Sequence, residues 1–72
     1  MSRVVRAAFE LQDCRGRPIL SVVLPVVKHD DYTGFDYATK HNGRVLNAAG
    51  VSQFVCDGCY DSYYRVKFLE FV

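Results

Sequence analysis

Residues 19–27 form an aliphatic run in which Ser21 and Pro25 are the two exceptions. Five of the other residues are valine or isoleucine, whose β-branched side chains fit a strand better than a helix. A short run of this kind is typical of a strand that is buried on both faces. Proline cannot donate a hydrogen bond to a neighbouring strand, so Pro25 favours a sheet edge or a bulge. We therefore predict that the rest of the chain is arranged to cover this strand.

Residues 3–12 alternate in side-chain polarity, which predicts a strand with one buried face. The residues predicted to share that face are Val5, Ala7, Phe9 and Leu11. Residues 13–18 contain Gly16, which adopts a positive φ without steric cost, and they predict a hairpin loop. The strands at 3–12 and 18–27 are then antiparallel neighbours, and Val23 is a predicted core residue.

Residues 35–49 carry the signals of a helix. Thr33 and Asp36 have the spacing of a capping box, with aspartate in place of the preferred glutamate. Gly50 is placed to end the helix in the left-handed conformation that glycine favours. These signals predict a helix that ends near Ala49 and packs on one face of the sheet.

A hairpin about Asn42 and Gly43 is the alternative for the same stretch, because Asn-Gly is the strongest short hairpin signal. The helix is preferred because residues 46–51 have the composition of a helix end. Gly43 would cost a helix about 1 kcal/mol relative to alanine, which permits a helix that begins only near Asn42.

The last part of the chain predicts two more strands, at 51–56 and 63–70, with Phe68 in the core. The alternation slips at Leu69 and Phe71, which indicates a bulge or a strand end. The expected fold class is α+β: a small antiparallel sheet in the order ββαββ with one helix packed on one face. A chain of 72 residues makes a single domain, 1–72.

Charge and cysteine content bound the class of protein. Nine basic and eight acidic residues leave a formal charge of +1, which gives little support for direct binding to a phosphate backbone. The apolar run is far shorter than the ~20 residues of a membrane-spanning helix, and no signal peptide is visible. Three cysteines, an odd number, argue against a closed disulfide framework and favour a reducing cytoplasm.

Cys56 and Cys59 have the spacing of half a zinc site. Cys14, His29 and His41 are the candidates for the other half, and no second Cys-x-x-Cys is present. The signal is therefore weak, and we predict that the fold needs no metal and no cofactor. A small zinc-stabilised nucleic-acid-binding domain is the alternative function, and the metal content of the purified protein separates the two.

His41 and the stretch His29-Asp30-Asp31 contain acid–base groups, but no nucleophile accompanies them at a recognisable spacing. The sequence also lacks a glycine-rich loop for phosphate. We therefore expect a solvated loop at 29–31, no catalytic residues and no enzyme activity.

Arginines on the first strand and its hairpin, with tyrosines elsewhere, favour a protein-binding module, because arginine and tyrosine dominate interface hot spots. The first strand is also a candidate free edge, since Pro25 limits the ladder of its neighbour. An extended tail of a partner would pair there by strand addition. The residues predicted to contact the partner are Arg3, Arg6, Arg15, Arg17, Tyr63 and Arg65.

The whole chain, from the opening Met1-Ser2-Arg3-Val4-Val5-Arg6-Ala7-Ala8-Phe9-Glu10, resembles the small phage-encoded regulators that bind bacterial RNA polymerase, of the kind found in a Xanthomonas phage. The resemblance implies contact with the large polymerase subunits near the RNA exit channel, in the host cytoplasm. It also implies inhibition of initiation at host promoters and read-through of terminators, with nucleic acid touched only indirectly. It rests on length and general character, so no individual binding residue is carried over.

Overall fold

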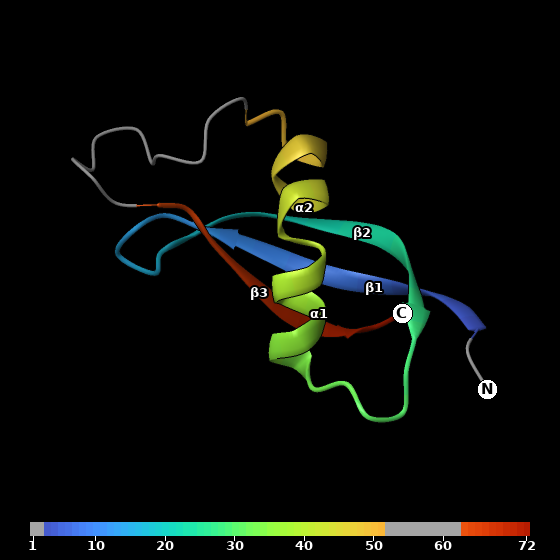
Figure 1. The fold of residues 1–72 in the computed structure, drawn as a ribbon. Helices are drawn as coiled ribbons and strands as arrows, with labels where there is room; N and C mark the ends of the chain where they lie inside the picture. The colour runs from blue at the N-terminus through green and yellow to red at the C-terminus, as the bar shows by residue number, and fades with distance from the viewer. Residues whose placement is uncertain (1–2, 52–62) are drawn as a thin grey trace.

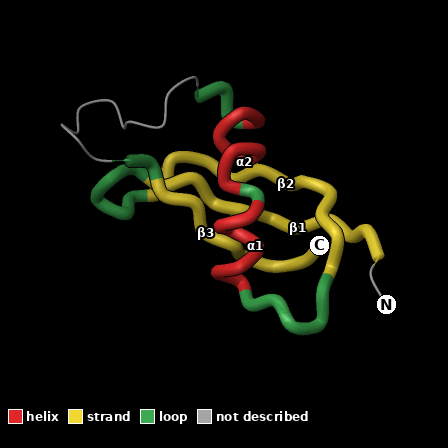
Figure 2. Tube along the Cα trace, viewed as in Figure 1, coloured by secondary structure: helices red, strands yellow, loops and turns green. Residues whose placement is uncertain are grey.

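The computed structural model describes residues 3–51 and 63–72 (Figure 1). The elements are β1 (Arg3–Gln12), β2 (Pro18–Lys28), α1 (Gly34–Lys40), α2 (Asn42–Ala48) and β3 (Arg65–Phe71). The strands form one antiparallel sheet in the order β2-β1-β3. Both helices lie on the same side of this sheet, with α1 against β3 and α2 against β1 and β2 (Figures 1 and 2). The α+β class with an antiparallel sheet is confirmed.

The predicted order ββαββ is matched only in part. Two short helices stand where one was expected, because the chain bends at His41, whose φ of −106° and ψ of 14° are not helical. The last strand begins two residues later than predicted and ends at Phe71. The strand predicted at 51–56 lies outside the described residues, apart from Val51, which belongs to no strand.

The central strand is β1, so the predictions that residues 19–27 form the buried centre and that the first strand is a free edge are both wrong. Phe9 and Ala7 on β1 are completely buried, and Leu11 is nearly so. On β2 the single buried residue is Val26, and Val23 is 50% exposed. The aliphatic run therefore lies in an edge strand. One face of this strand packs beneath the helices, and no described helix covers its other face.

Pro25 is compatible with β2 because its missing N–H points away from the sheet. Pro25 lies opposite Arg6 in the β1–β2 ladder. The carbonyl of Arg6 accepts a hydrogen bond from the N–H of Val72, on the β3 side of β1. The backbone groups of one residue in an antiparallel strand point the same way, so Arg6 and Pro25 form a pair without mutual hydrogen bonds. The backbone of Pro25 then faces the outer edge of β2, where proline is tolerated.

The predicted hairpin between β1 and β2 is confirmed. Gly16 has a φ of 83°, which glycine adopts without strain. The Asp13 carboxylate accepts bonds from the backbone N–H groups of Arg15 and Arg17 and from Nε of Arg17, at 2.9, 2.9 and 2.7 Å. These bonds lower the pKa of Asp13 from its ordinary value. The bond from the Arg17 N–H makes the largest contribution.

The helical prediction for residues 35–49 is also confirmed, and the Asn42-Gly43 hairpin is wrong. Thr33 and Asp36 form the predicted capping box: the Asp36 N–H donates to the Thr33 hydroxyl, and the Thr33 N–H donates to the Asp36 carboxylate. The helices remain linked by backbone bonds at His41, which donates to Tyr37 and accepts from Val45.

Gly50 ends α2 as the sequence predicts. Its φ is 76°, and its N–H donates to the carbonyl of Asn47, while the N–H of Val51 donates to the carbonyl of Leu46. This pair of bonds is a Schellman motif, which satisfies carbonyl groups that the helix end leaves without partners.

The bulge predicted near Leu69 is present and shapes the core. Phe9 pairs with Phe68, but Ala8 pairs with Glu70, so Leu69 is the extra residue. The extra residue brings Phe71 back to the side of the sheet that carries Phe68, and their ring centroids are 5.1 Å apart. An aromatic cluster results beneath α1, which explains why the alternation slips there.

Tyr37 fixes the loop between β2 and α1 to this cluster. Its ring is 2% exposed and contacts the rings of Phe68, Phe71 and Tyr32 at centroid distances of 5.3 to 5.5 Å. Its hydroxyl accepts a bond from the His29 N–H at 2.9 Å and donates to the His29 carbonyl at 3.0 Å. One buried side chain therefore satisfies both backbone groups at the end of β2.

Candidate functional site

The face of the sheet opposite the helices is the main uncovered surface of the described chain. Residues paired across an antiparallel sheet share a face, so the even-numbered residues of β1 and their partners lie there. One half of this face is mainly aliphatic around a single arginine, with Ala8 and its partner on β3, the exposed Glu70, at the border. We call this half the valine–arginine face; it consists of Val4, Arg6, Val23, Pro25, Val27 and Val72.

The aliphatic residues of the valine–arginine face are contiguous and open to solvent. Val4 pairs with Val27 and is 71% exposed, while Val27 itself is 40% exposed. Val72 and Val23 are 57% and 50% exposed. Isolated exposed valines are ordinary, but an apolar patch shared by three neighbouring strands is typical of an interaction surface.

Arg6 lies in the middle of this surface. It is exposed, with Pro25 opposite it on one side and Val72 on the other. Within residues 3–51 and 63–72 the single ion pair joins Arg17 and Asp13, so no described carboxylate holds the Arg6 guanidinium. A long arginine stem packs on apolar neighbours while its planar head stays available to bind a carboxylate on two points.

The six residues predicted to contact a partner fall into two groups. Arg3 and Arg6 lie at one end of β1, and Arg3 pairs with Lys28. Arg15 and Arg17 lie in the hairpin at the other end, roughly 30 Å away for a strand of this length, and Arg17 is bound to Asp13. The other two, Tyr63 and Arg65, precede and begin β3 at the hairpin end of the sheet, since Arg65 pairs with Gln12. The structure therefore does not unite the six in one patch.

The valines of the face were missed as site residues, although the sequence holds a signal for one of them, Val4. The alternation at 3–12 already places Val4 and Arg6 on the same side, away from the core. Val23 and Val27 were hidden by the interpretation of 19–27 as a strand buried on both faces. No local pattern indicates that Val72 extends the sheet by donating to Arg6.

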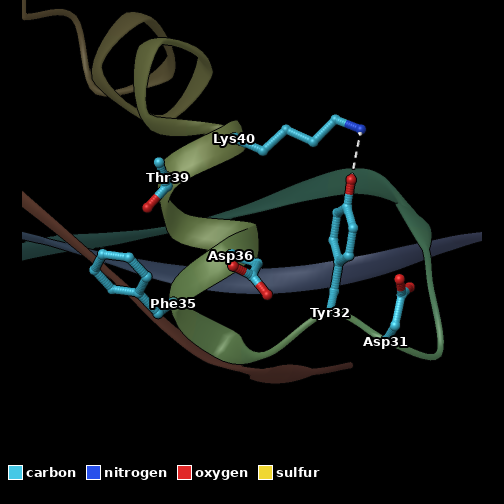
Figure 3. Close-up of a pocket in the computed structure, with 6 residues that line it drawn as sticks. All are labelled: Asp31, Tyr32, Phe35, Asp36, Thr39 and Lys40. Carbon is cyan, nitrogen blue, oxygen red and sulfur yellow. Dashed lines mark hydrogen bonds between the residues drawn. The ribbon is translucent and has the colours of Figure 1, made fainter.

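Two shallow hollows flank Phe35, which is 78% exposed on α1. The first, of about 370 Å³, is drawn in Figure 3, where Tyr32 and Phe35 lie on opposite sides of the helix. Lys40 reaches across it, with Nζ 3.4 Å from the Tyr32 hydroxyl and 5.4 Å from the ring centroid. The lysine thus already occupies the cation position above the tyrosine ring.

The second hollow, of about 320 Å³, lies between α1 and the start of β3. Asn42 lines it, and the side-chain oxygen of Asn42 is buried without a hydrogen-bond partner in the described structure. Both hollows are open to solvent. The first is lined by Asp31, Tyr32, Phe35, Asp36, Thr39 and Lys40, and the second by Phe35, Ala38, Thr39, Asn42, Tyr64, Arg65 and Val66.

The weak metal candidates are not assembled in the described residues, which contain no group of three side chains suited to a metal ion. Cys14 is disulfide-bonded, so it offers no thiolate to a metal, and the odd cysteine count did not predict this bond. Cys56 and Cys59 lie outside the described residues. A hairpin-loop cysteine carries no sequence signal that separates a thiol from a disulfide.

His41 is a core histidine. It is 8% exposed, and its ring lies 6.1 Å from that of Phe9. Nη1 of Arg44 lies 3.1 Å from Nδ1, which suits an unprotonated nitrogen at that position. Burial lowers the pKa of His41 from its ordinary value, and the positive charges of Arg44 and Lys40 lower it further.

The loop at 29–31 has the solvated character that the sequence predicts, with Asp30 and Asp31 exposed. The ring of His29 is 4.4 Å from that of Tyr32, so it packs on the loop itself. Its backbone is held by Tyr37.

Comparison with protein-family models, with curated proteins and with solved structures found no match for this chain. Neither of the two described helices is long and apolar enough to cross a membrane.

Proposed function

We propose that this chain is a non-catalytic protein-binding module that docks on a larger protein through its valine–arginine face. The observation that carries the proposal is Arg6, an exposed arginine without a described ion-pair partner, surrounded by exposed aliphatic residues. Binding hot spots have this composition: a central arginine or aromatic residue, with apolar neighbours that exclude water when the partner arrives.

The chemistry of the face defines the partner surface. A complementary surface presents a carboxylate that meets Arg6, enclosed by apolar side chains that cover Val4, Val23 and Val27. A phosphate backbone satisfies the first requirement but not the second. The near balance of charge in the whole chain also gives little affinity for nucleic acid alone.

Bacterial RNA polymerase is the partner that we propose, on the resemblance to small phage-encoded polymerase regulators. In this role the protein modifies transcription by occupying a surface of the large subunits, with reduced initiation at host promoters and increased read-through of terminators. In this role the protein is not an enzyme; it provides a binding surface on a small rigid sheet.

The experiment uses purified bacterial polymerase with the wild-type protein and two arginine variants. In Arg6→Glu the charge at the centre of the face is reversed; in the matched control, Arg44→Glu, the same reversal falls on an exposed residue of α2, on the other side of the sheet. We expect wild type and Arg44→Glu to co-migrate with polymerase on gel filtration. We expect Arg6→Glu to weaken binding at least about 30-fold, which corresponds to a hot-spot loss of ~2 kcal/mol.

Transcription from a promoter followed by a terminator gives the functional readout. Lower initiation or higher read-through with the wild type and the Arg44→Glu control, lost in Arg6→Glu, supports the proposal. If the wild type neither binds polymerase nor changes transcription, polymerase is not the partner. If the wild type binds and Arg6→Glu binds equally well, the valine–arginine face is not the docking surface.

A further inference from the structure

We infer that the outer edge of β2 accepts an extended segment of the partner as a fourth strand of the sheet, centred on Ser21 and Val23. The inference rests on the proposed function, because it names a second element of the same docking surface. The occupant is an extended segment with apolar residues at alternate positions and acidic residues at both ends.

The orientation of the backbone carries the inference. Pro25 faces outward because its partner Arg6 bonds to β3, and strand backbones alternate in direction from residue to residue. Ser21, Val23 and Val27 therefore also direct their N–H and C=O groups to the outer edge, where β2 has no neighbouring strand among the described residues. Ser21 and Val23 lie two residues apart and are both exposed, so together they offer four backbone hydrogen-bonding groups to one added strand.

Pro25 sets the limit of the pairing. An added strand forms both bonds at Ser21 and at Val23 but loses the donor at Pro25, so its register is fixed toward the hairpin end of β2. An uninterrupted exposed edge invites indiscriminate pairing between sheets, and a proline on the edge reduces that risk.

The other edge of the sheet is less suitable. β3 is shorter, with seven residues against eleven in β2, and the bulge at Leu69 interrupts its ladder. Bulges are a common means of blocking an edge.

Charge selects the occupant. β2 carries no acidic residue. At one end Lys28 lies beside Arg3, with Asp30 and Asp31 two and three residues farther along the chain. At the hairpin end, exposed Arg15 and Arg17 share a single carboxylate, Asp13, so the hairpin keeps a positive charge. A second copy of this chain, paired antiparallel about Val22, would bring Lys28 of each copy beside the positively charged hairpin of the other, which is repulsive. An apolar strand with acidic ends instead meets opposite charges at both ends.

The test uses a fluorescent, end-blocked peptide of nine residues that alternates valine and threonine between pairs of glutamates. Its binding to the full chain is followed by fluorescence anisotropy. Val23→Pro removes the outward N–H without touching the β1–β2 ladder, as Pro25 already does two residues away. Val23→Thr is the matched control, since it changes the same side chain and keeps the N–H. We expect Val23→Pro to weaken binding about tenfold or more and Val23→Thr less than about threefold.

Two further measurements make the result specific. A peptide with lysines in place of the glutamates is expected to bind at least about tenfold more weakly. Amide hydrogen exchange is expected to slow at Ser21 and Val23 when the acidic peptide binds, with little change at Val22 and Leu24, whose N–H groups already face β1. Circular dichroism shows whether Val23→Pro keeps the wild-type fold.

The inference is overturned if the wild type does not bind the acidic peptide, if a folded Val23→Pro protein binds it as tightly, or if exchange at Ser21 and Val23 is unchanged. The proposed function fails separately. Peptide binding without a polymerase complex refutes polymerase as the partner and retains strand addition. A polymerase complex that is lost in Arg6→Glu but kept in Val23→Pro retains the docking face and refutes the added strand.

Discussion

Replacing Tyr37 by phenylalanine is expected to destabilise the protein by about 1–3 kcal/mol, although it removes a single oxygen atom. The ring is buried and keeps its contacts with Phe68 and Phe71. The lost hydroxyl makes two hydrogen bonds, to the N–H and to the C=O of His29. Each such bond contributes ~0.5–1.5 kcal/mol net. The His29 N–H loses its partner, which adds to the loss, whereas the His29 carbonyl still accepts a bond from the Tyr32 N–H. A domain of this size has only about 4–11 kcal/mol of stability in total, so the loss is a large share.

The assay is thermal and urea unfolding followed by circular dichroism, in which a loss of this size lowers the Tm by roughly 5–20 °C. Tyr32→Phe is the matched control, because its hydroxyl makes a single long contact of 3.4 Å with Lys40. We expect the control to change stability by less than about 0.5 kcal/mol. Faster amide exchange at His29 in Tyr37→Phe, and not in the control, locates the loss at the loop. Equal stability of the two variants, with His29 exchange unchanged, refutes the anchoring role of Tyr37.

Three further predictions follow from the core, from the helix end and from the buried histidine. Phe68→Ala is expected to lower the free energy of unfolding by about 2–4 kcal/mol, because Phe68 is partly buried among aromatic rings. Val23→Ala is expected to lower it by less than ~0.5 kcal/mol, because Val23 is 50% exposed. The reverse order in chemical unfolding would contradict the orientation of the sheet. Gly50→Ala is expected to lower the stability by about 1 kcal/mol, because the φ of Gly50 is 76°. Gly43→Ala is expected to raise the stability by up to about 1 kcal/mol, because an added Cβ meets open space in α2. Equal effects of the two variants in thermal melts would refute this account. Burial holds the pKa of His41 below 6.5, so as the pH falls the unfolded chain takes up the proton before the folded protein does. The contribution of His41 to stability is therefore full above about pH 6.5 and falls as the pH drops below it. His41→Gln is expected to flatten this part of the pH profile of Tm.

The sequence predicts the local structure of this protein well, because short-range chemistry determines it. The Gly16 hairpin, the Thr33–Asp36 capping box and the Gly50 helix end each depend on a few neighbouring residues whose conformational preferences are strong. The bulge at Leu69 was also predictable, since the alternation must slip where an extra residue enters a strand. The α+β class follows from these elements.

The order of the strands was not predictable in the same way. Hydrophobic content made residues 19–27 the expected centre, but centrality depends on which strands bond to both neighbours, and that is a long-range property. β1 is central because β3 pairs with its other side, and β3 begins at Arg65, 62 residues after β1 begins at Arg3. Pro25 did indicate an edge strand, because proline belongs at a sheet edge, but the prediction gave more weight to the aliphatic run around it.

The sequence indicated that arginines take part in the candidate site, but it did not indicate where on the sheet the site lies. Arg6 was among the expected partner-binding residues, whereas Arg15 and Arg17 lie in the hairpin at the far end of β1, and Arg17 is bound to Asp13. An arginine count cannot show which guanidinium groups are paired, because pairing depends on side-chain geometry. Strand addition was likewise expected on β1; because the strand order makes β2 an edge strand and β1 the centre, our proposal concerns β2 instead.

The docking face and the free edge are coupled through the geometry of β2. Pro25 points its side chain to the open face, opposite Arg6, and its backbone to the outer edge. Both directions repeat every second residue, so Ser21, Val23 and Val27 do the same. A strand added at the edge would therefore place its own alternate side chains beside Val23 and enlarge the apolar surface around Arg6. For this reason a side-chain change such as Val23→Thr reports on the face alone, whereas Val23→Pro changes both the side chain and the outward N–H. The difference between the two variants measures the contribution of the edge.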